Sequence, residues 1–145
     1  TSAMREVLPM MDVLTRLRLK GVELSIDDFG TGYSSLVQLQ RLPFSEIKID
    51  RSLVVQMNNS KRCEAVVEII IDLARKLGLH SVAEGVEDEA ALNRLIELGC
   101  NSLQGFHLSR PIAADAVASF VREHRTAPAP ATPVACRASP GNGAA

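Results

Sequence analysis

The sequence contains no tryptophan, and aromatic residues make up only 3% of its 145 residues. A platform of aromatic side chains for stacking nucleic-acid bases is therefore not expected. The net charge is -1, so no strong field attracts the chain to a nucleic-acid polymer or to an anionic membrane. No apolar run approaches the ~20 residues that a membrane span needs. No secretory leader is visible either, and both absences favour a cytoplasmic protein.

Cysteines are few and widely separated, at Cys63, Cys100 and Cys136. Neither a Cys-x-x-Cys pair nor a cluster of histidine and cysteine occurs, so the sequence supports neither a disulfide framework nor a zinc site. The hydrophobic fraction of 46% and the charged fraction of 23% are ordinary for a globular protein. We therefore expect one modest domain with a core of its own.

The chain separates into a patterned part and a tail. Residues 126–145 hold four of the seven prolines and no periodic apolar pattern, which predicts a disordered tail rich in proline and alanine. Residues 1–125 are then the folded domain, in which helical and strand patterns alternate. We expect helices at 5–19, 34–41, 61–77, 88–98 and 113–124, and strands at 22–28, 46–50, 80–84 and 102–107.

This alternation predicts an α/β fold with a parallel sheet covered by helices. A doubly wound open sheet and part of a (β/α)8 barrel both fit the order of elements. Polar residues lie at or near the carboxyl end of every predicted strand: Asp27, Asp28, Lys48, Asp50, Glu84 and Gln104. In a barrel these ends converge on one face, whereas the outer strands of an open sheet contribute little to a site. The sequence therefore favours a partial TIM-type barrel of about four βα units.

Two adjacent aspartates, Asp27 and Asp28, end the first predicted strand. Neighbouring strand residues point to opposite sides, so we expect Asp27 to face the barrel mouth and Asp28 to lie at the rim. Two carboxylates this close repel each other unless cations neutralise them, and a pair of divalent ions would do so. The alternative is a capping aspartate with a solvated neighbour.

Lys48 alternates with two isoleucines in the second predicted strand and therefore faces away from them. Beside carboxylates, a lysine can orient a metal-bound water or help to deprotonate it. The alternative is a buried ion pair with Asp50 or Asp27. The residue alone does not separate the two interpretations.

The third and fourth predicted strands add candidates of two kinds. Glu84 would bring another carboxylate to the same face, or it would cap the helix that follows. Gln104 and Gly105 place an amide beside a residue without a side chain, which suits close approach by a flat ligand. The alternative for this pair is an ordinary turn at the end of a strand.

Four segments occur in an order and spacing that form a signature. They are DDFGTGYSSL at 27–36, LPFSEIKIDRSLV at 42–54, SVAEGVED at 81–88 and QGFHLSRP at 104–111. Together they resemble the EAL family of bacterial cyclic di-GMP phosphodiesterases, over nearly all of residues 1–120. The resemblance implies a (β/α)8-type barrel that binds two Mg2+ or Mn2+ ions and hydrolyses one phosphodiester of cyclic di-GMP to linear pGpG.

The same resemblance implies a role for each matching polar residue. Asp27 resembles the ligand that bridges both metal ions, and Asp28 and Glu84 resemble ligands of the second ion. Lys48 resembles the group that touches the nucleophilic water, and Asp50 resembles a supporting group. By this comparison Lys48, Glu84 and Asp50 are the expected catalytic residues.

On the substrate side, Glu87 resembles a residue that holds a loop linked to the substrate and to a dimer contact. Gln104 is similar to the active-site glutamine of the family, and Gly105 follows it. The expected ligand is cyclic di-GMP.

The sequence also departs from the family pattern. The Glu-Ala-Leu motif is absent, as are the segments that carry an asparagine and a further glutamate of the first metal site. The resemblance therefore implies the C-terminal half of an EAL domain, with an incomplete first metal site. An inactive remnant that binds cyclic di-GMP or another protein is the alternative. Expected partners are a second copy of the chain, pairing two half-barrels, and GGDEF or sensor domains of a parent protein.

Overall fold

The computed structural model of the chain describes residues 2–31, 39 and 42–124, with side chains described from residue 11 onward. The chain divides into two compact units, Thr1–Arg110 and Pro111–Ala145. The expected tail at 126–145 lies outside the described residues and stays a prediction. Among the helices that the structure describes, none has the length and apolar character needed to cross a membrane.

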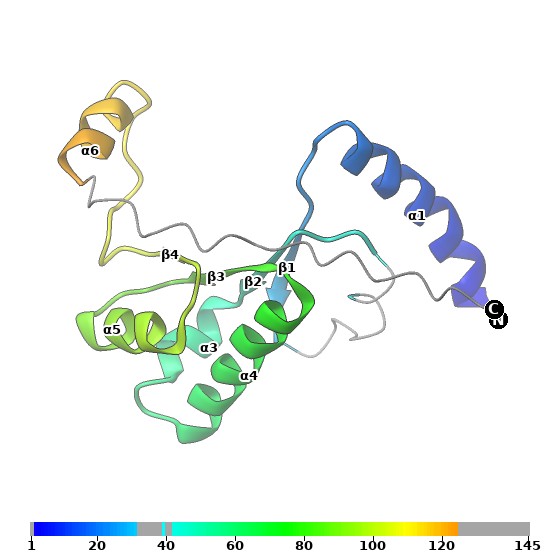
Figure 1. Cartoon of the computed structure of the whole chain (residues 1–145). Helices are drawn as coiled ribbons and strands as arrows, with labels where there is room; N and C mark the ends of the chain where they lie inside the picture. The colour runs from blue at the N-terminus through cyan, green and yellow to red at the C-terminus, as the bar shows by residue number, and fades with distance from the viewer. Residues whose placement is uncertain (1, 32–38, 40–41, 125–145) are drawn as a thin grey trace, which may run out of the picture. The chain divides into compact units, whose positions relative to one another are not determined.

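The first unit alternates strands and helices along the chain (Figure 1). Its helices are α1 (Ser2–Leu19), α3 (Arg51–Gln56), α4 (Lys61–Leu77) and α5 (Glu89–Leu98). Its strands are β1 (Ser25–Phe29), β2 (Glu46–Ile49), β3 (His80–Glu84) and β4 (Ser102–Gln104). The second unit contains α6 (Val117–Glu123). The helix expected at 34–41 lies outside the described residues, apart from Leu39, which is helical.

The four strands form one parallel sheet in the order β1-β2-β3-β4. Each strand therefore pairs with the next strand of the chain, and all four carboxyl ends lie at the same edge. A doubly wound sheet reverses its order at a switch point, whereas a barrel keeps the order of the chain. The predicted α/β fold is confirmed, and the order is that of a partial (β/α)8 barrel.

The hydrophobic core lies between one face of the sheet and helices α3, α4 and α5, which Figure 1 shows on the same side of the strands. Ile47 and Ile49 of β2 and Ala83 of β3 point into this core and are fully buried. The α4 side chains packed against them are Val67, Ile70, Ile71 and Ala74. Burial contributes about 1.5–3 kcal/mol for each large aliphatic side chain, so this stripe fixes α4 on the sheet.

Helices α4 and α5 begin and end at residues suited to those positions. The Ser60 hydroxyl accepts a hydrogen bond from a backbone N–H in the first turn of α4, and Asp88 does the same for α5. Gly78 ends α4 with φ 69°, a left-handed conformation in which a side chain is costly. The helix predicted at 61–77 is confirmed, and the one at 88–98 begins one residue later, after its cap.

Other elements differ from the prediction. Helix α3 was not expected, because six residues carry too little periodic signal. Strand β4 ends at Gln104 instead of residue 107, because the backbone then turns around Val86, whose carbonyl accepts a hydrogen bond from the His107 N–H at 3.0 Å. Strand β1 begins at Ser25 rather than at residue 22, and α6 is shorter than the predicted helix at 113–124.

A buried polar contact joins β3 to the start of β4. The N–H and hydroxyl of Ser81 both donate to Asn101 Oδ1, at 2.9 Å and 2.8 Å. The Asn101 N–H in turn donates to the Ser81 hydroxyl at 3.1 Å. The side chain of Ser81 is thus fully satisfied although Ser81 is only 1% exposed. These bonds fix the alignment of the two strands at their amino ends.

Candidate metal centre

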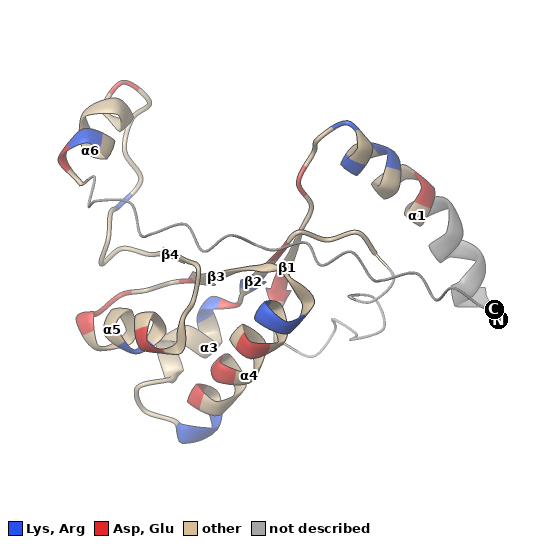
Figure 2. Ribbon diagram, viewed as in Figure 1, with Lys and Arg blue, Asp and Glu red and all other residues tan. Residues whose placement is uncertain are grey.

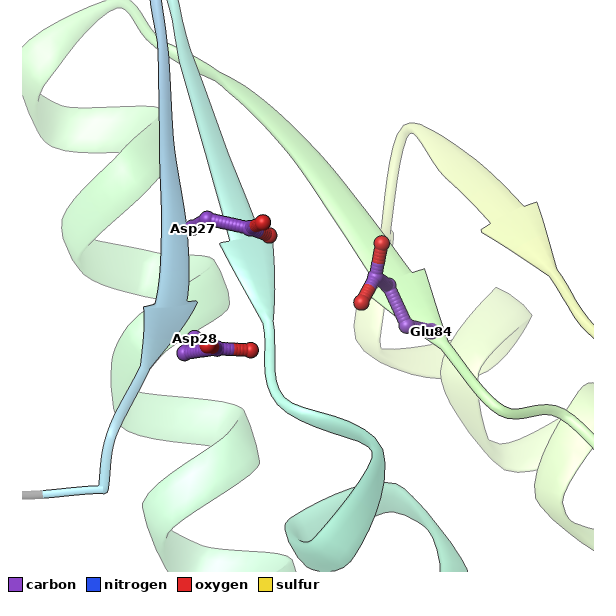
Figure 3. Close-up of side chains that lie close together, drawn as sticks. All are labelled: Asp27, Asp28 and Glu84. Atoms are coloured by element: carbon purple, nitrogen blue, oxygen red, sulfur yellow. The ribbon is translucent and has the colours of Figure 1, made fainter.

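Three carboxylates converge at the carboxyl edge of the sheet (Figure 3). Asp27 and Asp28 project from the end of β1, and Glu84 projects from the end of β3 on the other side of β2. Each offers one oxygen within 4.8 Å of the others, and no other group of this kind occurs among the described residues. Carboxylate oxygens are the ligands that hard divalent cations prefer, so these residues fit a divalent cation of that kind.

An irregularity in β1 brings both aspartates to the same place. Between Ile26 and Phe29 the chain advances three residues, while β2 advances two, which is a bulge. Asp28 has φ 51°, a left-handed conformation that aspartate tolerates better than most residues. The strict alternation on which the expected positions of Asp27 and Asp28 rest therefore does not hold at this point of the strand. The bulge turns the second carboxylate back towards the first.

Lys48 lies within this cluster, on the strand between the aspartates and the glutamate. Its ammonium donates to Asp27 Oδ1 at 3.0 Å and forms an ion pair with Glu84. The hydrogen bond to Glu84, and then the one to Asp27, hold the pKa of Lys48 above its usual range. The lysine is therefore a protonated donor. An ion pair with Asp27 is present, but it is not the buried pair considered above, because 64% of the Asp27 side chain is exposed.

The negative charges of the cluster act on one another. The charge of Asp27 is the largest cause that raises the pKa of Asp28, followed by burial and by the charges of Asp50 and Glu84. Figure 2 shows this acidic character at the end of β1. A site in which neighbouring charges raise the pKa of one carboxyl group, as at Asp28, binds cations favourably, because a cation removes the repulsion.

Asp50 caps the start of α3 and also places a negative charge beside Asp28. Its carboxylate accepts hydrogen bonds from the Ser52 N–H at 2.8 Å and from the Ser52 hydroxyl, and so caps the helix. The hydroxyl bond is the largest cause that lowers the pKa of Asp50. Asp50 therefore stays ionised beside Asp28 and adds to the negative potential of the cluster. Glu84 is not the cap of α5, since Asp88 caps that helix.

A pocket of about 290 Å³ opens next to Glu84. It is lined by Arg51, Glu84, Gly85, Glu87, Gln104, Gly105 and Phe106. The structure thus brings the predicted substrate-side residues Glu87, Gln104 and Gly105 together with the carboxylate cluster. A Cβ at Gly105 would overlap the backbone of Val86, so packing explains this glycine, and a ligand contact there stays a prediction.

Sequence reasoning missed three residues of this pocket, namely Arg51, Gly85 and Phe106. Arg51 forms an ion pair with Glu87, 36 residues further along the chain. Phe106 is 58% exposed at the pocket, and the guanidinium of Arg110 lies 5.2 Å from the centre of its ring. An arginine directly after Asp50 and an aromatic residue directly after the Gln104-Gly105 pair were the available signals.

Comparison with known proteins identifies relatives of this chain. The family model of the EAL domain matches residues 1–111. The bifunctional diguanylate cyclase/cyclic di-GMP phosphodiesterase MucR of Pseudomonas aeruginosa is 49% identical over 121 residues, which are 83% of this chain and 18% of that protein. The chain therefore spans less than a fifth of this relative.

Two solved structures are similar as well. The MucR phosphodiesterase in complex with cyclic di-GMP aligns with a TM-score of 0.72 and 50% identity, over 81% of this chain and 47% of that one. BlrP1 of Klebsiella pneumoniae, in complex with manganese and cyclic di-GMP, aligns with a TM-score of 0.64 and 41% identity. That alignment covers 69% of this chain and 26% of BlrP1.

Proposed function

The chain belongs to the EAL domain family, and on that premise we propose that it supplies the metal-binding edge of a cyclic di-GMP phosphodiesterase site. The observation that carries the proposal is the convergence of Asp27, Asp28 and Glu84 within 4.8 Å, at the carboxyl edge of a parallel sheet. A relative named as a cyclic di-GMP phosphodiesterase and a manganese complex of another relative support it.

In this proposal Asp27 would serve as a ligand to both of two divalent ions, and Asp28 and Glu84 would serve as ligands to one of them. Bound there, divalent ions lower the pKa of a water molecule and offset charge on the phosphoryl oxygens. Lys48 lies between the proposed ligands, with its ammonium 3.0 Å from Asp27 Oδ1, and in this proposal it would orient the attacking water as a hydrogen-bond donor. Asp50 holds the end of β2 and the start of α3 beside the cluster.

The pocket beside Glu84 is proposed to receive the nucleotide. Glu87, Gln104 and Gly105 line it, as does the exposed ring of Phe106. A nucleobase has an apolar face for a ring and a polar edge for an amide or carboxylate, which matches this lining. The expected product is linear pGpG.

The test is hydrolysis by the full chain. Purified protein is incubated with Mn2+ or Mg2+ and cyclic di-GMP, and the nucleotides are resolved by chromatography. We expect pGpG, its loss in Asp27→Asn, and no change in Asp12→Asn, because Asp12 is an exposed aspartate on α1 outside the cluster. Nucleotide binding without product would support the alternative function of a binding module. A folded chain that neither binds nor hydrolyses the nucleotide would overturn the proposal.

Partners of the chain are proposals as well. Strands β1 and β4 are the two outer strands of the sheet that the structure describes, and outer strands can pair with another chain. A second copy of this chain is one candidate, and GGDEF or sensor domains of a parent protein are others. Size-exclusion chromatography tests the first of these, since a clean monomer would contradict it.

A further inference from the structure

Arg51 links the loops that follow two neighbouring strands. It is the first residue of α3, directly after β2 and the capping residue Asp50. Its guanidinium Nε and Nη2 donate to Glu87 Oε1 at 3.1 Å and 2.5 Å, and Glu87 lies in the loop between β3 and α5. Two donors from one rigid guanidinium fix the direction of the contact better than a single ammonium would.

The aliphatic part of Arg51 also packs on the turn directly after Glu84. Gly85 has φ 73°, and a Cβ added there would overlap Cβ, Cγ and Cδ of Arg51. The arginine stem therefore lies against the backbone of Gly85 and occupies the space of a side chain. Arg51 thus touches this turn twice, through its stem at Gly85 and through its head at Glu87.

The contact continues into the next loop. Val86, between Gly85 and Glu87, is fully buried, and its N–H donates to the Gln104 carbonyl at 3.0 Å. The backbone of Val86 fills the space beside Gly105. The loops after β2, β3 and β4 are therefore in contact in that order. Arg51, after β2, contacts the loop after β3, and Val86 of that loop contacts the loop after β4. Glu84 is the last residue of β3 before this stack begins.

We propose that Arg51 is a positioning residue that fixes the turn after β3 and thereby directs the Glu84 carboxylate towards Asp27 and Asp28. The effect of Arg51 on metal binding rests on the proposed function, whereas its effect on the turn does not. An exposed ion pair contributes little to global stability, and the side chains of Arg51 and Glu87 are 66% and 39% exposed. Removing Arg51 should therefore have a small effect on the free energy of unfolding and a larger effect on metal affinity and on the order of the turn.

The first measurement is amide hydrogen exchange in the full chain with EDTA present. Arg51→Ala is expected to raise the exchange rate of the Val86 N–H, and Arg51→Lys is expected to restore much of the protection. Arg16→Ala is the matched control, because Arg16 is an exposed arginine paired with Asp12 on α1. Unchanged exchange at Val86 in a folded Arg51→Ala protein would overturn the inference, whatever the metal does.

The second measurement is calorimetric titration of the same proteins with Mn2+. Arg51→Ala is expected to weaken Mn2+ binding about tenfold, as is typical for residues that orient a metal ligand. Glu87→Gln keeps the size of the side chain and should weaken binding in the same direction, while Arg16→Ala should not. Equal affinity in all variants would overturn the role of Arg51 at Glu84. A wild-type chain that fails to bind Mn2+ would instead overturn the proposed function, and amide exchange would still decide whether Arg51 fixes the turn.

Discussion

Replacement of Lys48 by methionine is expected to tighten the binding of Mn2+ to the carboxylate cluster. The Lys48 ammonium already pairs with Asp27 and Glu84, and only 26% of its side chain is exposed. A divalent cation bound by the same oxygens is therefore repelled by the positive charge of Lys48. Methionine keeps the apolar stem of the side chain and removes that charge.

The expected gain follows from Coulomb repulsion. An ion of two charges and an ammonium about 5 Å apart repel each other by about 1–2 kcal/mol when the medium screens as water does. This corresponds to roughly a tenfold decrease in Kd. The carboxylates raise the pKa of Lys48 above its ordinary value of 10.5, so its charge persists throughout the neutral range. The ion pairs are lost only as the pH rises through the raised pKa of Lys48, which lies above 10.5. The gain in Mn2+ affinity should therefore be equal at pH 6 and pH 8.

Mn2+ titration of wild type, Lys48→Met and Lys76→Met tests this reasoning. Lys76 is an exposed lysine in the last turn of α4, next to the start of β3 and thus near the opposite edge of the sheet. We expect tighter binding only in Lys48→Met, together with slower hydrolysis because the water loses its donor. Equal or weaker binding in Lys48→Met would refute the reasoning and would mean that the lysine aligns the carboxylates rather than competing for them.

Three further predictions concern stability. Asp50→Ala should lower the free energy of unfolding in urea by about 1 kcal/mol, because α3 loses its cap to Ser52, and Asp50→Ser should recover most of it. Gly105→Ala should lower Tm, since the added methyl group collides with the backbone of Val86, at a cost of about 1–3 kcal/mol; an unchanged Tm would contradict that packing. The raised pKa of Asp28 means that the folded chain binds this proton more tightly than the unfolded chain. Stability in EDTA should therefore contain a part that falls as the pH rises from about 3.8, and Asp28→Asn should remove that part of the slope.

The regular elements could be predicted wherever the sequence repeats a pattern for long enough. Helix α4 shows an apolar stripe over 17 residues between Ser60 and Gly78, and its bounds follow directly. Helix α3 has six residues, fewer than two turns, so periodicity cannot reveal it. Its cap could have been recognised, because Asp50 is followed two residues later by a serine that bonds to it.

The site could be predicted in its residue types but not in its geometry. Parallel strands place their carboxyl ends at one edge, which is sufficient to bring Asp27 and Glu84 together from the sequence. The position of Asp28 depends on a bulge, and a bulge is a relation between two strands that one strand does not reveal. The contact between Arg51 and Glu87 likewise arises only when the sheet has formed, because it joins loops after different strands.

The buried bonds between Ser81 and Asn101 have an evolutionary consequence. They hold β3 and β4 in the alignment that pairs Glu84 with Gln104, and they do so from the edge that carries no candidate ligand. A slip of one residue would turn one of those two side chains to the helix-covered face. The bonds that hold this alignment lie at the amino ends of the strands. The loops at the carboxyl edge can therefore change in sequence and length under selection without shifting the strands. Selection for the site should therefore also act on a serine and an asparagine at the edge that carries no candidate ligand.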